Sequence, residues 1–177
     1  MSNLWLEQRS VVRVRVSAAW LRLKFHGCDP NYIKTVCHSI CCDHGARKNT
    51  IGVYFENERS GVESVGGHLE GSYLVNRNSH GSCFFQDEQT FLCKLHTSGF
   101  KPSGCCYAPF TLNKNDTLIV ARHFALLNCC RRDGLFPAYK VYRESLVALF
   151  GEEETGRIVL HLDSGGSDIY AAMPVVV

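Results

Sequence analysis

The sequence carries little net charge and has no long hydrophobic run. Its formal net charge is +2, from 19 basic and 17 acidic residues among 177, which gives no electrostatic signal for binding DNA or RNA. No segment is long and apolar enough to predict a membrane span. Residues 1–10 lack the basic segment and apolar run of a secretion signal. We therefore expect a cytoplasmic protein with no nucleic-acid or membrane partner.

Motifs for phosphate or dinucleotide binding are also missing. Gly165 and Gly166 form only a doublet and lack the spacing of a P-loop or a dinucleotide-binding turn. His161, Asp163 and Ser164 are close in sequence, but a catalytic triad is defined in space, so we interpret them as a helix end. No acid–base or nucleophile pair stands out, and the sequence leaves enzymatic activity open.

Cysteine, in contrast to these missing features, is abundant in the sequence. A domain of 177 residues buries roughly 70% of its unfolded surface, so it does not need crosslinks to make up for a missing core. A cytoplasmic protein also keeps its thiols reduced. The ten cysteines are Cys28, Cys37, Cys41, Cys42, Cys83, Cys93, Cys105, Cys106, Cys129 and Cys130.

Six of the cysteines form three adjacent pairs in the sequence: Cys41-Cys42, Cys105-Cys106 and Cys129-Cys130. Neighbouring Cα atoms lie about 3.8 Å apart, which is shorter than the roughly 4.4–6.8 Å of ordinary disulfides. A disulfide within a pair is therefore strained, and each pair would need two separate outside partners. A metal site needs only one sulfur of a pair, and the other can pack as a small hydrophobic group. The spacing favours metal binding over mixed disulfides or inert buried cysteines.

Several short strands are predicted from the N-terminal two thirds. Val12, Val14 and Val16 alternate with two arginines, which predicts a half-buried strand over residues 11–16 with the arginines on the wet face. Further strands are expected over residues 21–25, 51–55, 73–75 and 117–121. Residues 28–48 are expected to form a loop with at most one helical turn, and residues 56–82 to form turns around weak strands.

Two helices are predicted near the C-terminus. Pro137 suits the first position of a helix, and apolar residues at helical spacing continue to Phe150. Gly151 ends this helix, and the acidic residues 152–154 start the next one. The tail 171–177 is expected to be a strand or disordered. We therefore expect one domain over residues 1–177 with an α+β fold: a small irregular metal-centred core with short strands, followed by two C-terminal helices.

The cysteine spacing suits thiolate ligation. Cys37-x3-Cys41-Cys42 forms one close group, and Cys83, Cys93 and Cys105 follow at wider spacing. Thiolates are soft ligands that suit zinc and iron–sulfur clusters, and four of them close a structural zinc site or hold one cluster. His38, His44 and His96 are interpreted as neighbours of the site or solvent-facing residues, with ligation as the alternative. Lys94, Lys101 and Lys114 are interpreted as ordinary surface charges, with charge compensation at the site as the alternative.

Four sequence elements occur in the same order as in a known family. The first is Cys37-His38-Ser39-Ile40-Cys41-Cys42, and the second is Gly81-Ser82-Cys83-Phe84-Phe85. The third is Cys93-Lys94-Leu95-His96, and the fourth is Pro102-Ser103-Gly104-Cys105 followed by Pro109-Phe110. Over residues 28–110 the chain resembles the YkgJ-type cysteine-cluster family, named for a C-x-x-C-x-x-C-C motif and described as zinc- or iron-chelating.

The first element differs from the family motif because three residues separate Cys37 from Cys41. In this respect it is similar to the variant in flagellin lysine-N-methylases, which share the cysteine domain and are thought to carry an iron–sulfur cluster. This chain is short by comparison and shows no additional catalytic domain. The resemblance therefore implies metal binding and not methyl transfer.

The resemblance implies a set of six metal ligands: Cys37, Cys41, Cys42, Cys83, Cys93 and Cys105. The expected cofactor is a zinc ion or an iron–sulfur cluster, [4Fe-4S] if it is iron. Cys106 stands where the family has another residue type and is interpreted as a packing residue, whereas Cys28, Cys129, Cys130 and the number of sites are left open. We expect a structural or interaction module with a protein partner. The alternatives are an iron–sulfur redox or methylase-like enzyme and a disulfide-stabilised secreted protein.

Overall fold

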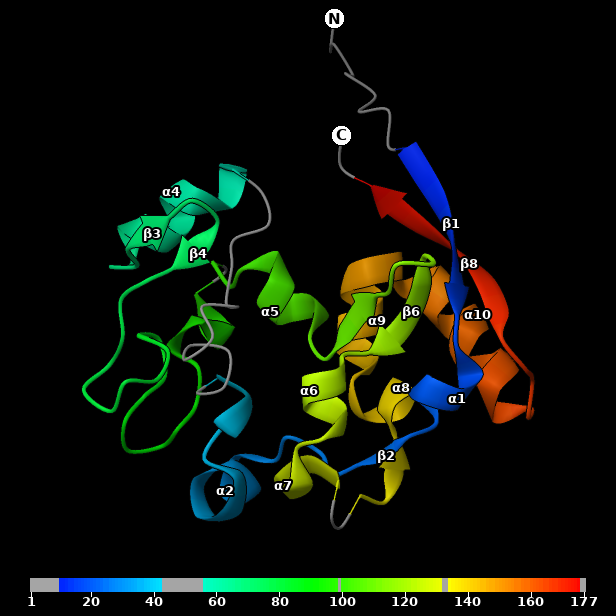
Figure 1. Cartoon of the computed structure of the whole chain (residues 1–177), viewed down its shortest axis with the longest axis horizontal. Coiled ribbons are helices and arrows are strands. Elements are labelled where there is room, and N and C mark those ends of the chain that lie inside the picture. Colours follow the sequence, from blue (N-terminus) through cyan, green and yellow to red (C-terminus); the bar gives the residue numbers. More distant parts are fainter. Residues whose placement is uncertain (1–9, 43–55, 99, 132–133, 176–177) are drawn as a thin grey trace, which may run out of the picture.

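A computed structural model describes residues 10–42, 56–98, 100–131 and 134–175 (Figure 1). These residues form two regions. The sheet region comprises residues 10–25 and 108–175, and the cysteine region comprises residues 28–42 and 56–107. In Figure 1 the cysteine region lies on the left and the sheet region on the right. The mixture of small sheets and short helices is an α+β fold, as predicted.

The main sheet joins the two ends of the described chain. It contains β1 (Ser10–Val16), β5 (Phe110–Leu112), β6 (Thr117–Val120) and β8 (Ile169–Val175), in the order β5-β6-β1-β8. β1 pairs with β8 in antiparallel register from Ser10↔Val175 to Val16↔Ile169, and with β6 in parallel register. The first and last strands are therefore neighbours, as Figure 1 shows.

The predicted alternation along β1 is confirmed for residues 13–16 and is wrong at Val12, which is exposed. Val14 and Val16 are fully buried, whereas Arg13 and Arg15 are exposed. The Arg13 guanidinium lies over the Tyr170 ring, 4.5 Å from its centroid. The buried face packs in one core with residues of three C-terminal helices, α8 (Ala138–Val141), α9 (Arg143–Phe150) and α10 (Glu152–Asp163).

The C-terminal helices largely follow the prediction. Gly151 separates α9 from α10 with a φ of 79°, which glycine adopts without strain. The prediction of one continuous helix after Pro137 is wrong. The backbone at Tyr142, with a φ of −110° and a ψ of 37°, separates two helices, α8 and α9. Pro137 precedes the first helical residue as the N-cap of α8. The helix-end interpretation of residues 161–164 is confirmed because α10 ends at Asp163.

The strand predicted over residues 21–25 is only partly correct. Residues up to Leu21 form α1 (Ala18–Leu21), and only β2 (Lys24–Phe25) is extended. The helix forms because the Asp168 carboxylate, far away in sequence, accepts the Ala18 N–H at 2.8 Å and so caps the first turn. β2 pairs with β7 (Phe136–Pro137). Between β6 and β7 lie α6 (Arg122–Ala125) and α7 (Asn128–Arg131).

The cysteine region is more helical than predicted. It contains α2 (Pro30–Tyr32), the π-helical turn η1 (Ile33–Cys37), α4 (Glu56–Ser64), β3 (Leu69–Glu70), β4 (Tyr73–Leu74), the 3₁₀ turn η2 (Lys94–Thr97) and α5 (Ser103–Tyr107). Asp29 caps α2 by accepting the N–H groups of Asn31 and Tyr32 at 2.9 and 3.0 Å. The loop prediction is therefore wrong at residues 30–37, and the prediction of turns around weak strands over residues 56–82 is wrong at residues 56–64 but correct in the strand at residues 73–74. Residues 43–48 lie outside the described residues. The strand predicted over residues 51–55 lies outside the described residues.

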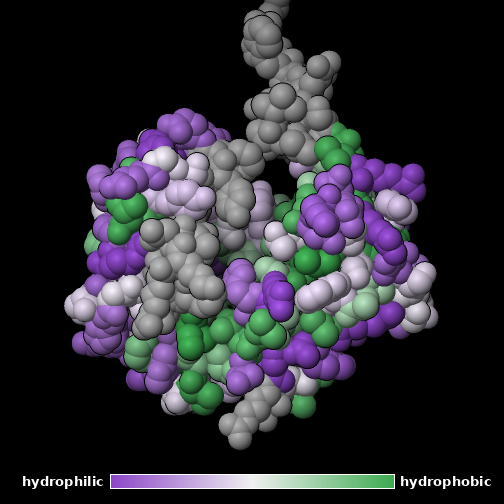
Figure 2. All heavy atoms as spheres, viewed as in Figure 1, coloured by the Kyte–Doolittle hydropathy of each residue, from purple (hydrophilic) through white to green (hydrophobic). Residues whose placement is uncertain are grey.

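The cysteine region has a small core of its own. Six buried residues form it: Val62, Leu69, Leu74, Cys83, Phe85 and Leu95. Exposed apolar side chains occur nearby at Val36, Ile40 and Leu126, and Figure 2 shows hydrophobic residues gathering in the lower middle of this face. Among the described residues, no helix has the length and apolar character needed to cross a membrane.

Candidate metal centre

The ten cysteines all lie in the described part of the chain, and all are free thiols. Nine of them fall into two neighbourhoods, and Cys106 belongs to neither. The loop thiol group consists of Cys42, Cys83, Cys93 and Cys105. The α7 thiol group consists of Cys28, Cys37, Cys41, Cys129 and Cys130. The two groups meet where Cys41 and Cys42 are adjacent and hydrogen-bonded through their side chains.

The loop thiol group draws its members from distant segments of the cysteine region. Cys83 belongs to the small core, and Cys42 and Cys93 pack against that core. Cys105 comes from α5, and burial raises the pKa of its thiol to about 12. The charges of Cys83 and Cys93 add to this increase, so the Cys105 thiol lies near both. Four thiols separated by up to 63 positions therefore share one part of the structure.

The backbone after Cys83 affects its thiol. Hydrogen bonding by the backbone of Phe85 and Gln86 lowers the pKa of Cys83, against the larger effect of burial, which raises it, and the Gln86 N–H donates to the Cys83 carbonyl at 2.9 Å. Phe85 and Gln86 are two and three residues after the cysteine. Hydrogen bonds to a sulfur favour its thiolate form, which is the form that binds metal.

The α7 thiol group shows the same arrangement at Cys37. Its sulfur accepts N–H groups from Ser39 and Ile40, again two and three residues further on. The side-chain hydrogen bond with Cys130 is the largest cause that lowers the pKa of Cys37, to about 6. Cys129 is also within hydrogen-bonding reach of Cys37.

The other members of this group are close as well. The Sγ atoms of Cys129 and Cys130 are 3.7 Å apart. Burial raises the pKa of Cys28 to about 11, and the charges of Cys41 and Cys37 contribute to the increase. Cys37 and Cys41 thus influence the ionisation of Cys28, Cys129 and Cys130.

The turn between Cys37 and Cys41 is held in an unusual conformation. His38 and Ser39 both have positive φ values, 50° and 48°, which non-glycine residues adopt rarely. The buried Gln86 donates from Nε2 to the His38 carbonyl at 3.0 Å. The His38 ring stacks on Phe91 with centroids 4.5 Å apart. The loop around Cys83 therefore supports the turn that carries Cys37.

Tyrosine side chains and one backbone hydrogen bond attach the α7 thiol group to its surroundings. The Tyr32 hydroxyl donates to the Cys129 carbonyl, and the backbone N–H of His26 donates to the Cys130 carbonyl at 2.7 Å. Tyr142 hydrogen-bonds with the Cys28 thiol and packs edge-on against Phe25, with centroids 5.4 Å apart. The sequence did not single out Tyr142 for this role, because its helical spacing marks it only as a core residue.

The six predicted ligands are divided between the two groups. Cys37 and Cys41 lie with the α7 thiols, and the remaining four form the loop thiol group. Among the residues that the structure describes, no set of three or more histidine, cysteine, aspartate or glutamate side chains is arranged so that it could hold a metal ion. The thiols are neighbours in space, but they do not form a closed coordination shell. Thiol donors fit a thiophilic metal. The side chains would have to move closer to one another to complete a coordination shell.

The remaining candidates have identifiable surroundings. The Cys106 thiol donates to the Lys101 carbonyl at 3.6 Å, and the Lys101 charge lowers the pKa of Cys28 and Cys105. Burial lowers the pKa of His96, and His44 lies outside the described residues. A cation near the thiols can offset part of their negative charge.

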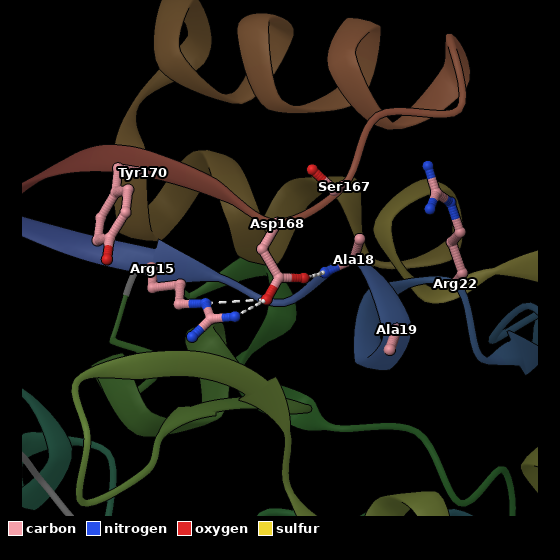
Figure 3. A pocket seen from close by; sticks show the side chains of 7 residues that line it. All are labelled: Arg15, Ala18, Ala19, Arg22, Ser167, Asp168 and Tyr170. Atoms are coloured by element: carbon pink, nitrogen blue, oxygen red, sulfur yellow. Dashed lines mark hydrogen bonds and ion pairs between the residues drawn. The ribbon is translucent and has the colours of Figure 1, made fainter.

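The structure has two notable pockets, and one of them borders the thiols. One, of about 410 Å³, is lined by Cys37, His38 and Glu88 among others, and gives solvent access to the α7 thiol group. The other, of about 650 Å³, lies in the sheet region (Figure 3). There Arg15 donates from Nε to Asp168 at 2.9 Å, and Arg22 donates to the Gly166 carbonyl at 2.7 Å. Because its charged walls already bind one another, this second pocket is not a candidate site.

No protein-family model, curated protein or solved structure matches this chain. The resemblance to the YkgJ-type cysteine-cluster family therefore stays a prediction based on the cysteine elements.

Proposed function

We propose that this protein binds zinc or an iron–sulfur cluster through cysteine thiolates and acts as a structural or interaction module in the reducing cytoplasm. The observation that carries the proposal is the loop thiol group, in which four thiols from separate segments share one neighbourhood. Thiolates are the preferred protein ligands of zinc and of iron–sulfur clusters. If the metal is iron, a [4Fe-4S] cluster matches a set of four cysteines.

Two further features support this function. Hydrogen bonding by the backbone of Phe85 and Gln86 favours the thiolate form of Cys83, as hydrogen bonds to ligating groups do in metal sites. The small core of the cysteine region leaves it short of buried apolar surface. In small metal domains the ligands come together only when the metal binds, because binding and folding are coupled. The open arrangement of the thiols suits such coupled closure.

A protein partner is part of the proposal. Val36, Ile40 and Leu126 are large hydrophobic residues that remain exposed near the thiols. Gathered apolar residues on a surface mark interaction sites more often than isolated ones do. An iron–sulfur redox or methylase-like enzyme is the alternative, favoured by the pocket beside Cys37, which leaves room for a small substrate.

The test is elemental analysis with a visible spectrum on the full chain prepared without oxygen. We expect bound zinc with a colourless protein, or iron and sulfide with broad visible absorbance. Cys83→Ser combined with Cys105→Ser should lose the metal of the loop thiol group. Cys106→Ser is the matched control, because it changes the neighbouring thiol and should retain that metal.

Two outcomes would contradict the proposal. The first is a reduced protein that binds no zinc or iron after reconstitution. The second is a near absence of free thiols when the denatured protein is titrated without reductant, which would indicate the disulfide-stabilised alternative. A coloured cluster whose loss abolishes a redox reaction would support the enzyme alternative over the structural module.

A further inference from the structure

β8 is an edge strand without a charged residue. Within the described residues it pairs with β1 on one side and with no strand on the other (Figure 1). Its residues, Ile169–Val175, are apolar apart from Tyr170. Natural edge strands commonly carry charges, because an unprotected edge can add a strand from another chain. Pro174 protects one end of β8, since it has no N–H group, so protection of the remaining edge must come from elsewhere.

Two side chains of α10 cover that edge. The Ala172 N–H donates to Glu154 Oε1 at 2.7 Å, and the Arg157 guanidinium donates to the Tyr170 carbonyl at 2.6 Å. Arg157 also donates from Nε to Glu154 Oε2 at 2.8 Å, so each side chain fixes the other. We call Glu154 and Arg157 the edge clamp. In an antiparallel ladder the N–H and C=O of one residue point to the same side, so the backbone groups of Tyr170 and Ala172 all point away from β1.

We propose that the outer edge of β8 is a pairing surface for β8 of a second copy of this chain, and that the edge clamp blocks it. A symmetric antiparallel pair centred on Ala171 places Tyr170 of each copy opposite Ala172 of the other. Each of these two residue pairs exchanges two N–H···O=C bonds, so four bonds join the copies. In two of the four, the Ala172 N–H meets the Tyr170 carbonyl. The edge clamp already occupies both of these groups.

The residues of β8 suit this register. A pair centred on Ala172 would need an N–H group at Pro174, which proline lacks, whereas a pair centred on Ala171 needs none there. The backbone of Ala171 pairs with β1, so the two Ala171 residues would face each other without hydrogen bonds. At such positions the Cα atoms lie about 4.5 Å apart, which suits a small side chain. Tyr170, half exposed in one chain, would be covered in the pair.

The experiment measures the mass of the full chain by sedimentation velocity, with reductant present because the thiols are free. The double variant Glu154→Ala/Arg157→Ala removes the edge clamp and leaves the net charge unchanged, since one acid and one base are lost. We expect its apparent mass to double from the 19.8 kDa of one chain as its concentration rises. Arg143→Ala/Glu152→Ala is the matched control, because it removes another ion pair of α10 and should remain monomeric, as should the natural chain.

Ala172→Pro tests whether β8 is the surface that pairs. Proline removes the N–H group that the second copy needs, but it leaves the pairing with β1 intact because that N–H points away from β1. Adding Ala172→Pro to the double variant should return the mass to that of one chain. A further measurement needs no variant. In the natural chain the Ala172 N–H should exchange with solvent about 10-fold more slowly than an exposed amide without a hydrogen bond.

Several results would overturn the inference. One is a double variant that is folded by circular dichroism and stays monomeric at every concentration. Another is association that Ala172→Pro does not reverse, or that the control pair shows equally, because a different surface would then be responsible. Fast exchange of the Ala172 N–H in the natural chain would show that the edge clamp does not form. If the double variant does not fold, Glu154→Ala alone takes its place, because it frees the same N–H. None of these results depends on bound metal, so they leave the proposed function untouched.

Discussion

The sheet region and the cysteine region are held together by different means. In the sheet region a continuous cluster of sixteen buried residues packs between the sheet and its helices, and seven residue pairs join β1 to β8. The described part of the cysteine region has a core of only six buried residues, one of which is Cys83. Because hydrophobic stabilisation scales with buried apolar area, the cysteine region needs another source of stability. Its thiols are the candidates for that source.

The α7 thiol group lies between these regions. Cys130 is part of the sheet-region core, and its partner Cys37 ends η1 in the cysteine region. Figure 1 shows α7 next to α2 at the bottom of the molecule. A metal ion at the loop thiol group would order the cysteine region. The comparison between the regions can be tested by removing the metal.

Metal removal should produce the largest effect. We expect a chelator to raise amide hydrogen exchange in β3, β4 and α5 by about 100-fold or more, which corresponds to about 3 kcal/mol of lost protection. The physical reason is that metal binding and folding are coupled in regions with small cores. Exchange measured by mass spectrometry resolves the two regions within one sample.

The sheet region supplies the internal control for this experiment. Exchange in β1 and β8 should change little, because the pairing of these two strands does not involve thiols. Equal loss of protection in both regions would show that the chain is one cooperative unit. Unchanged exchange everywhere would show that the thiols contribute nothing to stability.

A matched pair of core substitutions should have the next largest effect. Leu146 is fully buried in the sheet region and Leu74 is nearly so in the cysteine region. Leu146→Ala should lower the free energy of unfolding by about 2–5 kcal/mol, because it leaves a cavity. The loss should be the same with and without metal. It is measured by denaturant unfolding followed by circular dichroism.

Leu74→Ala should behave differently. Its effect on hydrogen exchange in the cysteine region should appear in the metal-loaded protein and vanish in the metal-free protein, where that region is already open. An equal effect of Leu74→Ala in both states would mean that the small core is sufficient by itself, and would remove the main difference between the regions.

Asp168 provides a smaller, pH-dependent test in the sheet region. Its carboxylate accepts the Ala18 N–H at 2.8 Å and pairs with Arg15, and these contacts lower its pKa. Asp168→Ala should reduce stability at pH 7 by about 0.5–2 kcal/mol, as loss of a helix cap does. Denaturant unfolding measures it, and Glu70→Ala, at an exposed position in β3, is the control.

The sign of the pH dependence follows from the lowered pKa. The stabilisation by Asp168 is complete above the unfolded-state pKa of about 3.9 and is lost as pH falls through the lower folded-state pKa. The difference between the natural chain and Asp168→Ala should therefore be constant from pH 5 to 7 and shrink below pH 4. A constant difference down to pH 2 would show that the carboxylate charge does not matter.

The sequence predicted the sheet region better than the cysteine region because its signals are local. Alternation marks β1, and Gly151 with the acidic residues after it marks the break between α9 and α10. α1 could not be predicted, because its cap comes from Asp168, which is 150 positions away. α4 was missed because Glu56–Ser64 is polar apart from the buried Val62, so the apolar periodicity that indicates a helix is weak.

For the candidate site, the sequence identified cysteines but not their grouping. Spacing placed Cys41 and Cys42 in one close group with Cys37. In the structure their thiols are hydrogen-bonded to each other, and Cys42 is also near Cys83 and Cys105. Cys129 and Cys130 reach Cys37 because β2 and β7 pair and bring α7 beside η1. That tertiary contact has no signal in cysteine spacing. The role of Tyr142 beside Cys28 depends on the same packing.

The smallest effect should come from a substitution of Arg59, whose side chain is not a proposed metal ligand. Its guanidinium pairs with Glu56 at 2.8 Å and donates to the Gly71 carbonyl at 2.5 Å, so it connects α4 to the β3–β4 turn. Arg59→Gln should weaken these contacts by about 0.5–1 kcal/mol. If folding of the cysteine region is coupled to metal, chelator competition should show about 2–5-fold weaker retention of the metal.

Arg157 is the matched control, because it makes the same kinds of contact in the sheet region. It pairs with Glu154 at 2.7 Å and donates to the Tyr170 carbonyl at 2.6 Å. Arg157→Gln should lower the stability of the sheet region by a similar amount but leave metal retention unchanged. If both arginine variants weaken metal retention equally, stability is shared across the whole chain. If only Arg59→Gln does so, the metal stabilises the cysteine region specifically, as its small core requires.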